Sequence, residues 1–262
     1  MTPFHWVDLL YVLSGFCVGA LVGMTGVGGG SLMTPVLVLL FGVHPATAVG
    51  TDLLYAATTK AAGTVVHNLH RTIEWRIVGR LATGSIPAAT LTILVLSRVS
   101  MSSDASRTLI NNVLGAALLL TALVLIFRRW ILAAYAARVG QLDARTTKAL
   151  TIAFGAVLGL LVAISSVGAG AIGVTALLLL YPDLPMRRIV GSDIAHAVPL
   201  TLVGGLGHWF LGTINWPILA SLLVGSLPGV FLGGHVSIRL PDPVLRFSLA
   251  AILAVVASRL VM

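Results

Sequence analysis

Charged residues are scarce in this sequence. Of its 262 residues only 9% are Asp, Glu, Lys or Arg, whereas 58% are hydrophobic, and the mean hydropathy is +1.04. A soluble domain carries roughly 25% charged residues, so this chain has too few to cover a water-exposed surface. Disordered segments have low hydrophobicity, which is the opposite of this composition. The sequence therefore excludes a soluble enzyme and a disordered tail, and it predicts a polytopic integral membrane protein.

Other features of soluble and secreted proteins are also missing. Cys17 is the one cysteine, so no disulfide framework can form. The nucleotide-binding pattern G-x-x-x-x-G-K-[ST] and the G-x-S-x-G turn of serine hydrolases do not occur. We therefore expect no nucleotide-driven step, no catalytic site, no cofactor and no metal. The first ten residues, MTPFHWVDLL, lack the basic stretch of a secretory signal, so we expect them to remain in the mature chain.

Apolar segments separated by short breaks fill most of the chain. Eight contain 18 to 23 residues, close to the ~20 residues that a membrane-spanning helix needs. The segments 31–41 and 171–181 contain only 11 residues each, which is ~17 Å of helix and too short to cross alone. Each of these two follows a glycine-rich break. The ten segments are 7–24, 31–41, 46–66, 77–97, 109–127, 149–167, 171–181, 189–211, 217–236 and 244–261.

The sequence also repeats itself at an offset of 140 to 141 residues. V-G-G-G at 27–30 recurs as V-G-A-G at 167–170, V-G-T-D at 49–52 as V-G-S-D at 190–193, His67 as His208, and G-S-I-P at 84–87 as G-S-L-P at 225–228. Composition alone does not explain several motifs on one offset. We interpret the chain as one integral membrane domain with an N-terminal repeat at 1–127, a basic linker at 128–148 and a C-terminal repeat at 149–262.

The basic residues indicate the topology. If the connections alternate sides through all ten segments, twelve Lys and Arg residues fall on one side and three on the other. If each short segment is instead a re-entrant loop added to a full span, the distribution is 9 against 6. The positive-inside rule favours the first arrangement. We expect a multi-pass protein of the bacterial cytoplasmic (inner) membrane, with both termini outside and 128–148 in the cytoplasm.

In this arrangement the chain passes from one side of the membrane to the other an odd number of times in each half. The two halves are therefore inserted in opposite orientations. The predicted fold class is an all-α polytopic membrane protein of about 8–10 membrane segments, built from two inverted repeats. Each repeat contains a glycine-rich broken helix or a helical hairpin. We prefer the hairpin, in which 7–24 and 31–41 enter and leave on one face with the break at the tip. If 7–24 and 31–41 instead crossed the membrane separately, the chain would return to the same side, and the two halves would still be inverted.

The glycine-rich breaks are the first candidate site. A helix interrupted at membrane depth exposes backbone groups that lipid cannot satisfy, so it must be buried in protein or line a cavity. The free N–H groups that start a short helix suit a small anion, and Ser31 is a candidate N-cap. The alternative interpretation is close helix packing through glycine. The candidate substrate-binding residues at the breaks are Gly28, Gly29, Gly30 and Ser31 in the first half, and Ser165, Ser166, Gly168 and Gly170 in the second.

Two carboxylates occupy equivalent places in the repeat. Asp52 and Asp193 lie near the starts of the third and eighth segments. Carboxylates within a membrane usually carry protons or bind ions; the alternative is a helix N-terminal carboxylate that stabilises the dipole. Thr51 and Ser192 precede them, and we expect these hydroxyls to cap the helices or to contact substrate.

Two basic side chains lie within apolar segments. Lys60 is the one cation deep in such a segment, and its repeat equivalent is Thr201, so the fold does not require the charge. A buried lysine facing a cavity would attract an anion, whereas the alternatives are snorkelling or pairing with Asp52 or Asp193. His196, in the eighth segment, is the candidate for a buried proton carrier. The expected coupling residues are Asp52, Asp193 and His196.

These motifs resemble a known family. The stretch GVGGGSLMTPVLVLLFGVHPATAVGTDLL is similar to the N-terminal signature of the TauE/SafE sulfite exporters, and VGAGAIGVTALLLLYP and VGSDIAHA resemble its internal repeat. The resemblance covers nearly the whole chain. It implies a secondary carrier of sulfite, sulfoacetate or related anions, and it assigns functional positions to Gly28, Gly30, Ser31, Thr51, Asp52, Gly168, Gly170, Ser192 and Asp193. The second half departs from the first with Ala169 and Ala171 in place of Gly29 and Ser31.

The sequence hence predicts a secondary transporter of small sulfur-containing anions that works by alternating access. The expected partners are a small anionic substrate and the lipid bilayer, with no nucleic acid; assembly as a homodimer stays open. Two other hypotheses stand beside it. One is a passive anion channel. The other is an intramembrane serine hydrolase, for which Ser31 has no obvious base.

Overall fold

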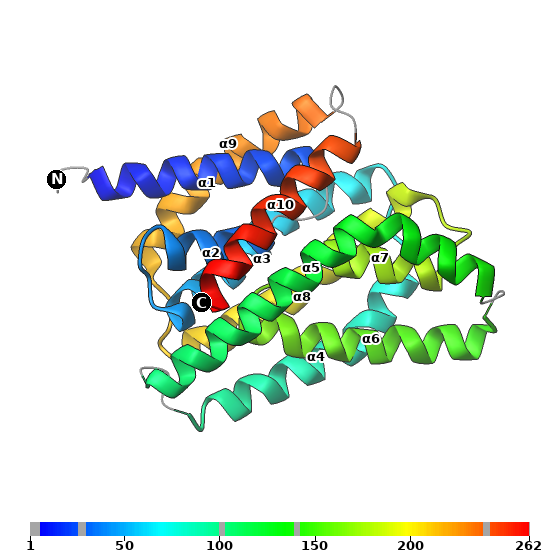
Figure 1. The fold of residues 1–262 in the computed structure, drawn as a ribbon, viewed down its shortest axis with the longest axis horizontal. Coiled ribbons are helices and arrows are strands. Elements are labelled where there is room, and N and C mark those ends of the chain that lie inside the picture. Colours follow the sequence, from blue (N-terminus) through cyan, green and yellow to red (C-terminus); the bar gives the residue numbers. More distant parts are fainter. Residues whose placement is uncertain (1–5, 26–29, 100–102, 139–141, 238–241, 262) are drawn as a thin grey trace.

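The fold is entirely helical in the part of the chain that the structure describes. The computed structural model describes residues 6–25, 30–99, 103–138, 142–237 and 242–261, which form ten α-helices without a strand (Figure 1). The predicted all-α fold is thereby confirmed. The helices are α1 (Trp6–Thr25), α2 (Gly30–Leu39), α3 (Pro45–Leu69), α4 (Trp75–Leu96), α5 (Asp104–Arg138), α6 (Ala144–Ser165), α7 (Ala171–Leu180), α8 (Met186–Phe210), α9 (Trp216–Ser237) and α10 (Asp242–Val261).

Each predicted segment coincides with one helix, but the basic linker differs from the expectation. Most of 128–148 is helical, because α5 continues to Arg138 and α6 begins at Ala144. The stretch after Arg128 is rich in Ala, Leu and Arg, which are strong helix formers, and basic charge does not end a helix. Asp143 caps α6 by accepting hydrogen bonds from the N–H groups of Arg145 and Thr146, both at 3.1 Å. The side-chain hydroxyl of Thr146, together with these backbone bonds, holds the pKa of Asp143 below its usual value.

Both short helices fold back on the helix before them. In α6 and α7, Thr151 near the start of one helix shares a hydrogen bond of 2.8 Å with the hydroxyl of Tyr181, just after the end of the other. In α1 and α2, the ring of Tyr11 lies 4.4 Å from that of Phe41 between centroids. Contact between the start of one helix and the end of the next requires an antiparallel pair. The preferred hairpins are therefore present in both halves; the glycine-rich tip at 26–29 lies outside the described residues.

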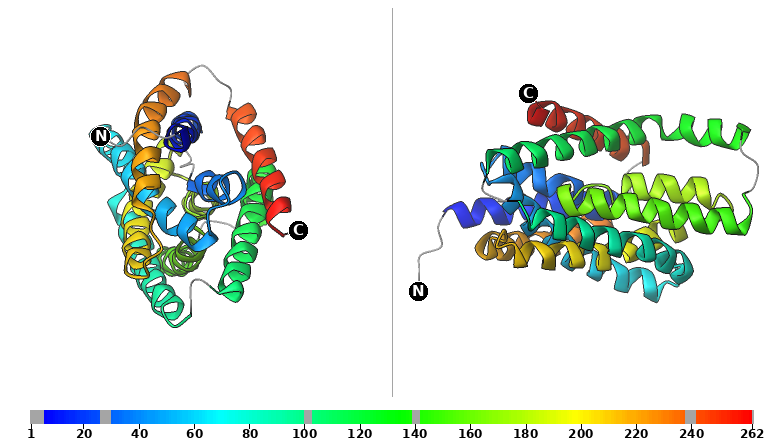
Figure 2. Two further views of the ribbon diagram at one scale, coloured as in Figure 1. Left: turned by 90° about the vertical axis from the view of Figure 1, so that its left-hand side faces the viewer. Right: turned by 90° about the horizontal axis from the view of Figure 1, so that it is seen from below.

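Helices α3 and α8 pack against each other in the interior. Five helices of the described part are long and apolar enough to span a membrane: α4, α5, α6, α8 and α9. Helix α3 has 25 residues, yet it is not one of them because Asp52, Lys60 and several threonines lower its hydropathy. This polarity is tolerated because Asp52, Lys60 and two of the threonines, Thr51 and Thr59, are buried in the protein. Figure 2 (left) shows α2 enclosed by the longer helices.

The helix contacts of the two halves correspond to each other. Helix α1 packs along α9, and α6 packs along α4. Both contacts depend on glycine: a Cβ on Gly15 would meet the Leu222 backbone, and a Cβ on Gly155 would meet the Leu81 backbone. Glycine lets two helix backbones approach closely, and both helix pairs use this kind of packing. The offsets between these positions are those of the sequence repeat.

Each half also holds a loop of the other half through a hydrogen bond, and the two bonds occupy equivalent positions in the repeat. Thr51 of α3 accepts a hydrogen bond from the N–H of Asn215, at 3.1 Å. Its repeat equivalent, Ser192 of α8, accepts one from the N–H of Glu74, at 2.9 Å. Each half therefore positions the loop that precedes α9 or α4 of the other. These contacts support a two-fold relation between the repeats; their opposite orientation in a membrane stays a proposal.

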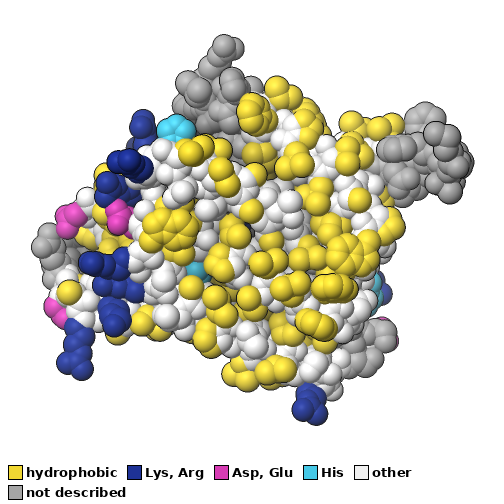
Figure 3. All heavy atoms as spheres, turned by 180° about the vertical axis from the view of Figure 1, so that it is seen from behind, with side chains coloured by type: hydrophobic (Ala, Val, Ile, Leu, Met, Phe, Trp, Pro, Cys, Tyr) yellow, Lys and Arg dark blue, Asp and Glu magenta, His cyan; other side chains and the backbone are white. Residues whose placement is uncertain are grey.

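The surface has the character expected of a protein embedded in lipid. Figure 3 shows hydrophobic side chains spread over the middle of one face, with most of the visible Lys and Arg gathered toward one end. Trp75 and Trp216, at the starts of α4 and α9, are about half exposed. Tryptophan is enriched where a membrane meets water, and the exposure of these two residues is consistent with such an interfacial position.

Candidate functional site

The carboxylate of Asp52 is held at the packing interface of α2 and α3. It is completely buried, and Oδ2 accepts hydrogen bonds from the backbone N–H and the hydroxyl of Thr34, at 3.1 and 2.5 Å. Its Oδ1 is buried without a hydrogen-bond partner in the described part of the protein. Asp52 lies in the second turn of α3, beyond the orphan N–H groups of the helix start. A role as a simple helix N-terminal carboxylate is therefore excluded.

Lys60 connects α3 to the break of the other half. Its side chain is buried, and Nζ donates a hydrogen bond of 3.3 Å to the carbonyl of Ala169, between α6 and α7. Lys60 interacts electrostatically with Asp193 and Asp52, although neither carboxylate lies within the 4.0 Å of a direct ion pair. Snorkelling to the membrane surface is excluded because the side chain points into the protein.

The break before α7 is built from strained and small residues. Ser166 has a left-handed backbone (φ 58°), and Gly168 and Gly170 have φ values of 126° and 139°, which side chains with a Cβ rarely adopt. Ser165 stabilises the turn, because its hydroxyl donates to the Leu161 carbonyl at 2.7 Å and accepts from the N–H of Val167 at 3.2 Å. The Ser166 hydroxyl makes no such bond. It lies beside the carboxylate of Asp52.

Asp193 occupies the equivalent place on α8, against α7. It is buried, and its carboxylate lies over Gly173, where an added Cβ would collide with Oδ1. Glycine at 173 is therefore needed to admit the carboxylate between the two helices. Oδ1 is a buried atom without a hydrogen-bond partner among the residues described.

Next to this carboxylate, His196 is paired with a serine that the sequence analysis did not select. Its Nε2 lies 2.8 Å from Oγ of Ser85 on α4, and Nδ1 is buried with no partner in the described structure. At the repeat offset of 141 the same two positions are Tyr55 and Ser226. Their hydroxyls face each other but form no hydrogen bond of normal geometry. Ser85 and Ser226 both belong to the repeated G-S-x-P motif, so the sequence repeat could have identified them.

Some of the predicted binding residues make structural contacts instead, and others lie outside the described residues. Thr51 and Ser192 direct their hydroxyls at the loops described above, which favours a structural role over substrate contact. Gly30 is the first residue of α2. Gly28 and Gly29 lie outside the described residues, as does the side chain of Ser31. Thr34, which binds Asp52, carried no signal in the sequence beyond being polar in a short apolar helix.

The arrangement concentrates unsatisfied polar groups in one buried region. Buried polar groups normally have hydrogen-bond partners, and those without one are candidates for ligand or proton contacts. Six atoms of this kind lie on α3, α8, α9 and the α6–α7 break: Asp52 Oδ1, Tyr55 Oη, Ser166 Oγ, Asp193 Oδ1, His196 Nδ1 and Ser226 Oγ. With Lys60 among them, the region can bind a small polar anion and exchange protons. No three His, Cys, Asp or Glu side chains of the described residues are grouped for a metal ion.

We expect Thr34→Val to destabilise the protein by about 1–3 kcal/mol, because one hydrogen bond to a buried carboxylate is lost while the shape is kept. The free energy of unfolding would be measured by denaturant titration in mixed micelles. Thr58→Val is the matched control, since Thr58 is exposed and its hydroxyl bonds only to the Leu54 carbonyl of its own helix. Equal losses in both variants would contradict the role of Thr34.

Comparison with known proteins places this helical arrangement in a family. The family model described as Sulfite exporter TauE/SafE matches residues 11–260. A probable membrane transporter protein of Bacillus subtilis (strain 168), YjnA, is 38% identical over 251 residues, which are 95% of this chain and 98% of YjnA. A second from the same organism, YdhB, is 27% identical over 91% of this chain and 94% of its own length.

A more distant relative comes from Methanocaldococcus jannaschii. This probable membrane transporter protein, MJ0441, is 25% identical over 94% of this chain and 92% of its own length. No solved structure matches. The family model spans nearly all of the chain, including both hairpins and the buried polar region between them. The chain is therefore a multi-pass membrane transporter and belongs to the sulfite exporter TauE/SafE family.

Proposed function

We propose that the protein is a secondary transporter of small sulfur-containing anions, such as sulfite, sulfoacetate or other organosulfonates. The family description supports the sulfur chemistry. One observation on this chain carries the proposal: Lys60, a buried cation from the first half, reaches the helix break of the second half. A buried charge is costly unless it is paired or has a function. Lys60 makes no direct ion pair with a described carboxylate, so it is suited to hold a transient anion.

The anion site follows from the chemistry around Lys60. Helix α7 begins at Ala171, directly after the carbonyl that Lys60 contacts. The first N–H groups of a helix carry partial positive charge and bind anions. The hydroxyl of Ser166 adds a donor. We assign Lys60, Ser166 and the start of α7 to anion binding. Gly30 and Ser31 of the first half would contribute in the same manner from α2.

Asp52, Asp193 and His196 are the proposed coupling residues. The two carboxylates flank Lys60 on α3 and α8, so a proton on either changes the charge that an arriving anion meets. His196 lies on α8 three residues after Asp193 and shares a hydrogen bond with Ser85. Proton binding at these groups would drive the anion along or against its own gradient.

The coupling role is tested with Asp193→Asn in proteoliposomes. We expect accumulation driven by a pH gradient to fall to the level of protein-free vesicles, because asparagine cannot carry the proton. Exchange of labelled for unlabelled anion should continue, because the anion site is kept. Asp104→Asn is the control, since Asp104 is exposed at the start of α5. Retained pH-driven accumulation in Asp193→Asn would rule out this residue as the proton carrier.

Alternating access is the mechanism that the repeated architecture favours. In this proposal each hairpin moves as a unit against α3 and α8, together with the loops before α4 and α9. This movement opens the central site to one side of the membrane at a time. In this proposal the repeats are inverted in a bacterial inner membrane, both termini are outside, and the basic ends of α5 and α6 are cytoplasmic. Assembly as a homodimer is compatible with this arrangement.

The two other hypotheses receive less support. A passive channel needs no proton carrier beside the anion site, whereas two buried carboxylates flank Lys60. The Ser85–His196 pair has the distance of a hydrolase nucleophile and base. However, Ser85 lies inside α4 rather than on an exposed turn, and Nδ1 of His196 has no orienting partner in the described structure. The pair is better suited to holding or moving a proton.

The direct test of the substrate class is a binding panel on the detergent-purified protein. Sulfite, sulfoacetate and taurine would be compared with chloride, nitrate and acetate. We expect saturable binding that is selective for the sulfur anions. Equal binding across the panel, or none, would overturn the sulfur assignment while leaving the architecture intact.

A further inference from the structure

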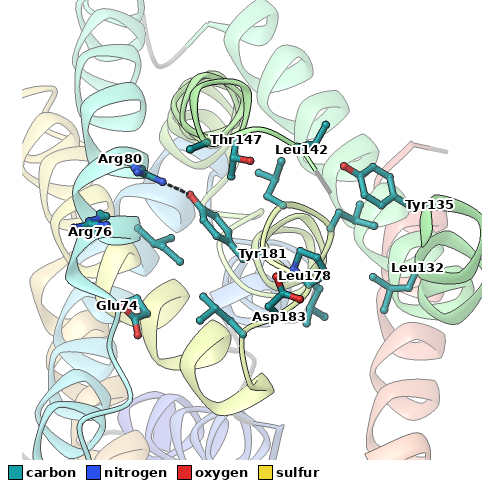
Figure 4. A pocket seen from close by; sticks show the side chains of 16 residues that line it. Glu74, Arg76, Arg80, Leu132, Tyr135, Leu142, Thr147, Leu178, Tyr181 and Asp183 are labelled. Carbon is teal, nitrogen blue, oxygen red and sulfur yellow. Dashed lines mark hydrogen bonds between the residues drawn. The ribbon is translucent and has the colours of Figure 1, made fainter. Parts of the chain in front are cut away.

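A large pocket opens at the opposite end of α7 from the central break. Its volume is about 880 Å³, and it lies among the starts of α4 and α6 and the ends of α5 and α7 (Figure 4). Helix α7 separates it from the central site by ten residues, which is ~15 Å of helix. The pocket is therefore a second site, independent of the transport site proposed above.

The pocket presents two arginines from one helix face. Arg76 and Arg80 are four residues apart on α4 and both line it, as neighbours on a helix surface do. Arg80 donates a hydrogen bond of 3.1 Å to the neutral hydroxyl of Tyr181, which Figure 4 shows as a dashed line. Arg76 makes no hydrogen bond or ion pair with any residue that the structure describes. Neither positive charge is neutralised by these contacts.

One acidic residue of the pocket is paired with an arginine outside the pocket lining. Glu74 forms an ion pair of 2.5 Å with Arg188 at the start of α8, and Asp183 also has an interaction of its own. Because Arg188 already neutralises Glu74, Glu74 does not cancel the charges of Arg76 and Arg80. The pocket keeps a positive surface that is complementary to a phosphate or another doubly hydrogen-bonding anion.

The repeat does not require this charge. At the offset of 141 residues, Pro217 stands for Arg76 and Ser221 for Arg80. The equivalent of Tyr181, at an offset of 140, is Phe41. The fold is thus compatible with uncharged side chains at these positions. The pair of arginines is therefore a property of this half and not a requirement of the repeated fold.

Most of the remaining lining residues are apolar, which narrows the class of ligand. The pocket is lined by Leu132 and Tyr135 of α5, by Leu142, and by Leu178 and Leu184 around the end of α7. A free oxyanion does not need such walls, whereas a headgroup attached to acyl chains does. Trp130, highly exposed on α5 one turn before Tyr135, fits the membrane–water boundary at this level.

We propose that this pocket binds the phosphate headgroup of an anionic phospholipid, with its acyl chain along the leucine wall. Basic pockets between membrane helices on the cytoplasmic side bind such headgroups. Arg76 and Arg80 hold the phosphate, and Tyr181 positions Arg80. The bound lipid would tie α4 to the α6–α7 hairpin, which moves in the proposed alternating access.

The test measures binding of phosphatidylglycerol to the purified protein in detergent by native mass spectrometry, with phosphatidylcholine as the neutral lipid. We expect phosphatidylglycerol to bind preferentially, and its Kd to rise at least about tenfold in Arg76→Gln/Arg80→Gln, a loss of about 1.4 kcal/mol. Arg76→Gln alone should weaken binding without disturbing Tyr181. Arg98→Gln, an exposed arginine at the other end of α4, is the matched control.

Three results would overturn the proposal. Equal binding of the two lipids would remove the need for charge recognition. Equal loss in Arg98→Gln would show that only overall charge matters. Displacement of phosphatidylglycerol by millimolar glycerol phosphate or inorganic phosphate would identify a soluble anion as the ligand. Lys60→Met should keep the lipid effect, so failure of the transport proposal and failure of this one give different results.

Discussion

Lys60→Met should abolish the binding of sulfur anions while the protein stays folded. Methionine approximates the unbranched apolar stem of lysine, and it removes the charge to which we assign anion binding. It also removes the hydrogen bond to the carbonyl of Ala169, which leaves a buried acceptor without its donor and lowers the free energy of unfolding by about 1–3 kcal/mol. The affinity for the anion should fall at least about a hundredfold, which is a loss of about 2.8 kcal/mol in binding free energy. Binding of sulfite would be measured by calorimetry on the detergent-purified variant.

The chain offers a matched control for this substitution. Lys148, its other lysine, is exposed on α6, and Lys148→Met should bind sulfite as the unmodified protein does. Unchanged affinity in Lys60→Met would contradict the assignment of the anion site. Loss of the folded state would show instead that Lys60 is needed to stabilise the buried carboxylates. The elution profile from size-exclusion chromatography separates these outcomes.

Gly84→Val should prevent stable packing of α4 on α6. A Cβ at Gly84 would collide with the backbone carbonyl of Ile152 and lie 2.8 Å from the N–H nitrogen of Ala156. Both are backbone atoms of α6, so no side-chain rotation relieves the contact and the helices must separate. Overpacking of this kind costs about 3 kcal/mol or more. The yield of monodisperse protein and the apparent Tm in detergent would be measured.

Gly79→Val is the control for the effect of valine itself. Gly79 lies on the same helix, and a Cβ there meets no atom within 4 Å. Its apparent Tm should stay near that of the unmodified protein. Similar losses in the two variants would mean that helix propensity, rather than the contact with α6, explains the result.

Much of the fold follows from sequence patterns with a direct physical cause. Hydrophobic length and glycine or proline breaks mark the helix ends, because unsatisfied backbone groups are not tolerated in lipid. The two short helices and their hairpins follow from the same rule. The extension of α5 to Arg138 was missed because basic residues were taken to mark a loop, although they are compatible with a helix that leaves the membrane.

The site was only partly predictable. Asp52, Lys60, Asp193 and His196 stand out because charge within apolar segments is expensive. Which groups they meet depends on the crossing of α3 and α8 and on the path of α7, and neither is encoded in local sequence. The contact of Lys60 with Ala169 spans 109 positions. Ser85 could have been found, because it recurs at the repeat offset as Ser226 in the same G-S-x-P motif.

The most direct test of the central claim is counterflow in proteoliposomes containing the unmodified protein. Vesicles loaded with unlabelled sulfite would be diluted into a trace of labelled sulfite. A carrier that alternates between two sides should transiently accumulate the label above its equilibrium level, and Lys60→Met should not. Labelled sulfite that only equilibrates, without an overshoot in the unmodified protein, would contradict alternating access and identify a channel.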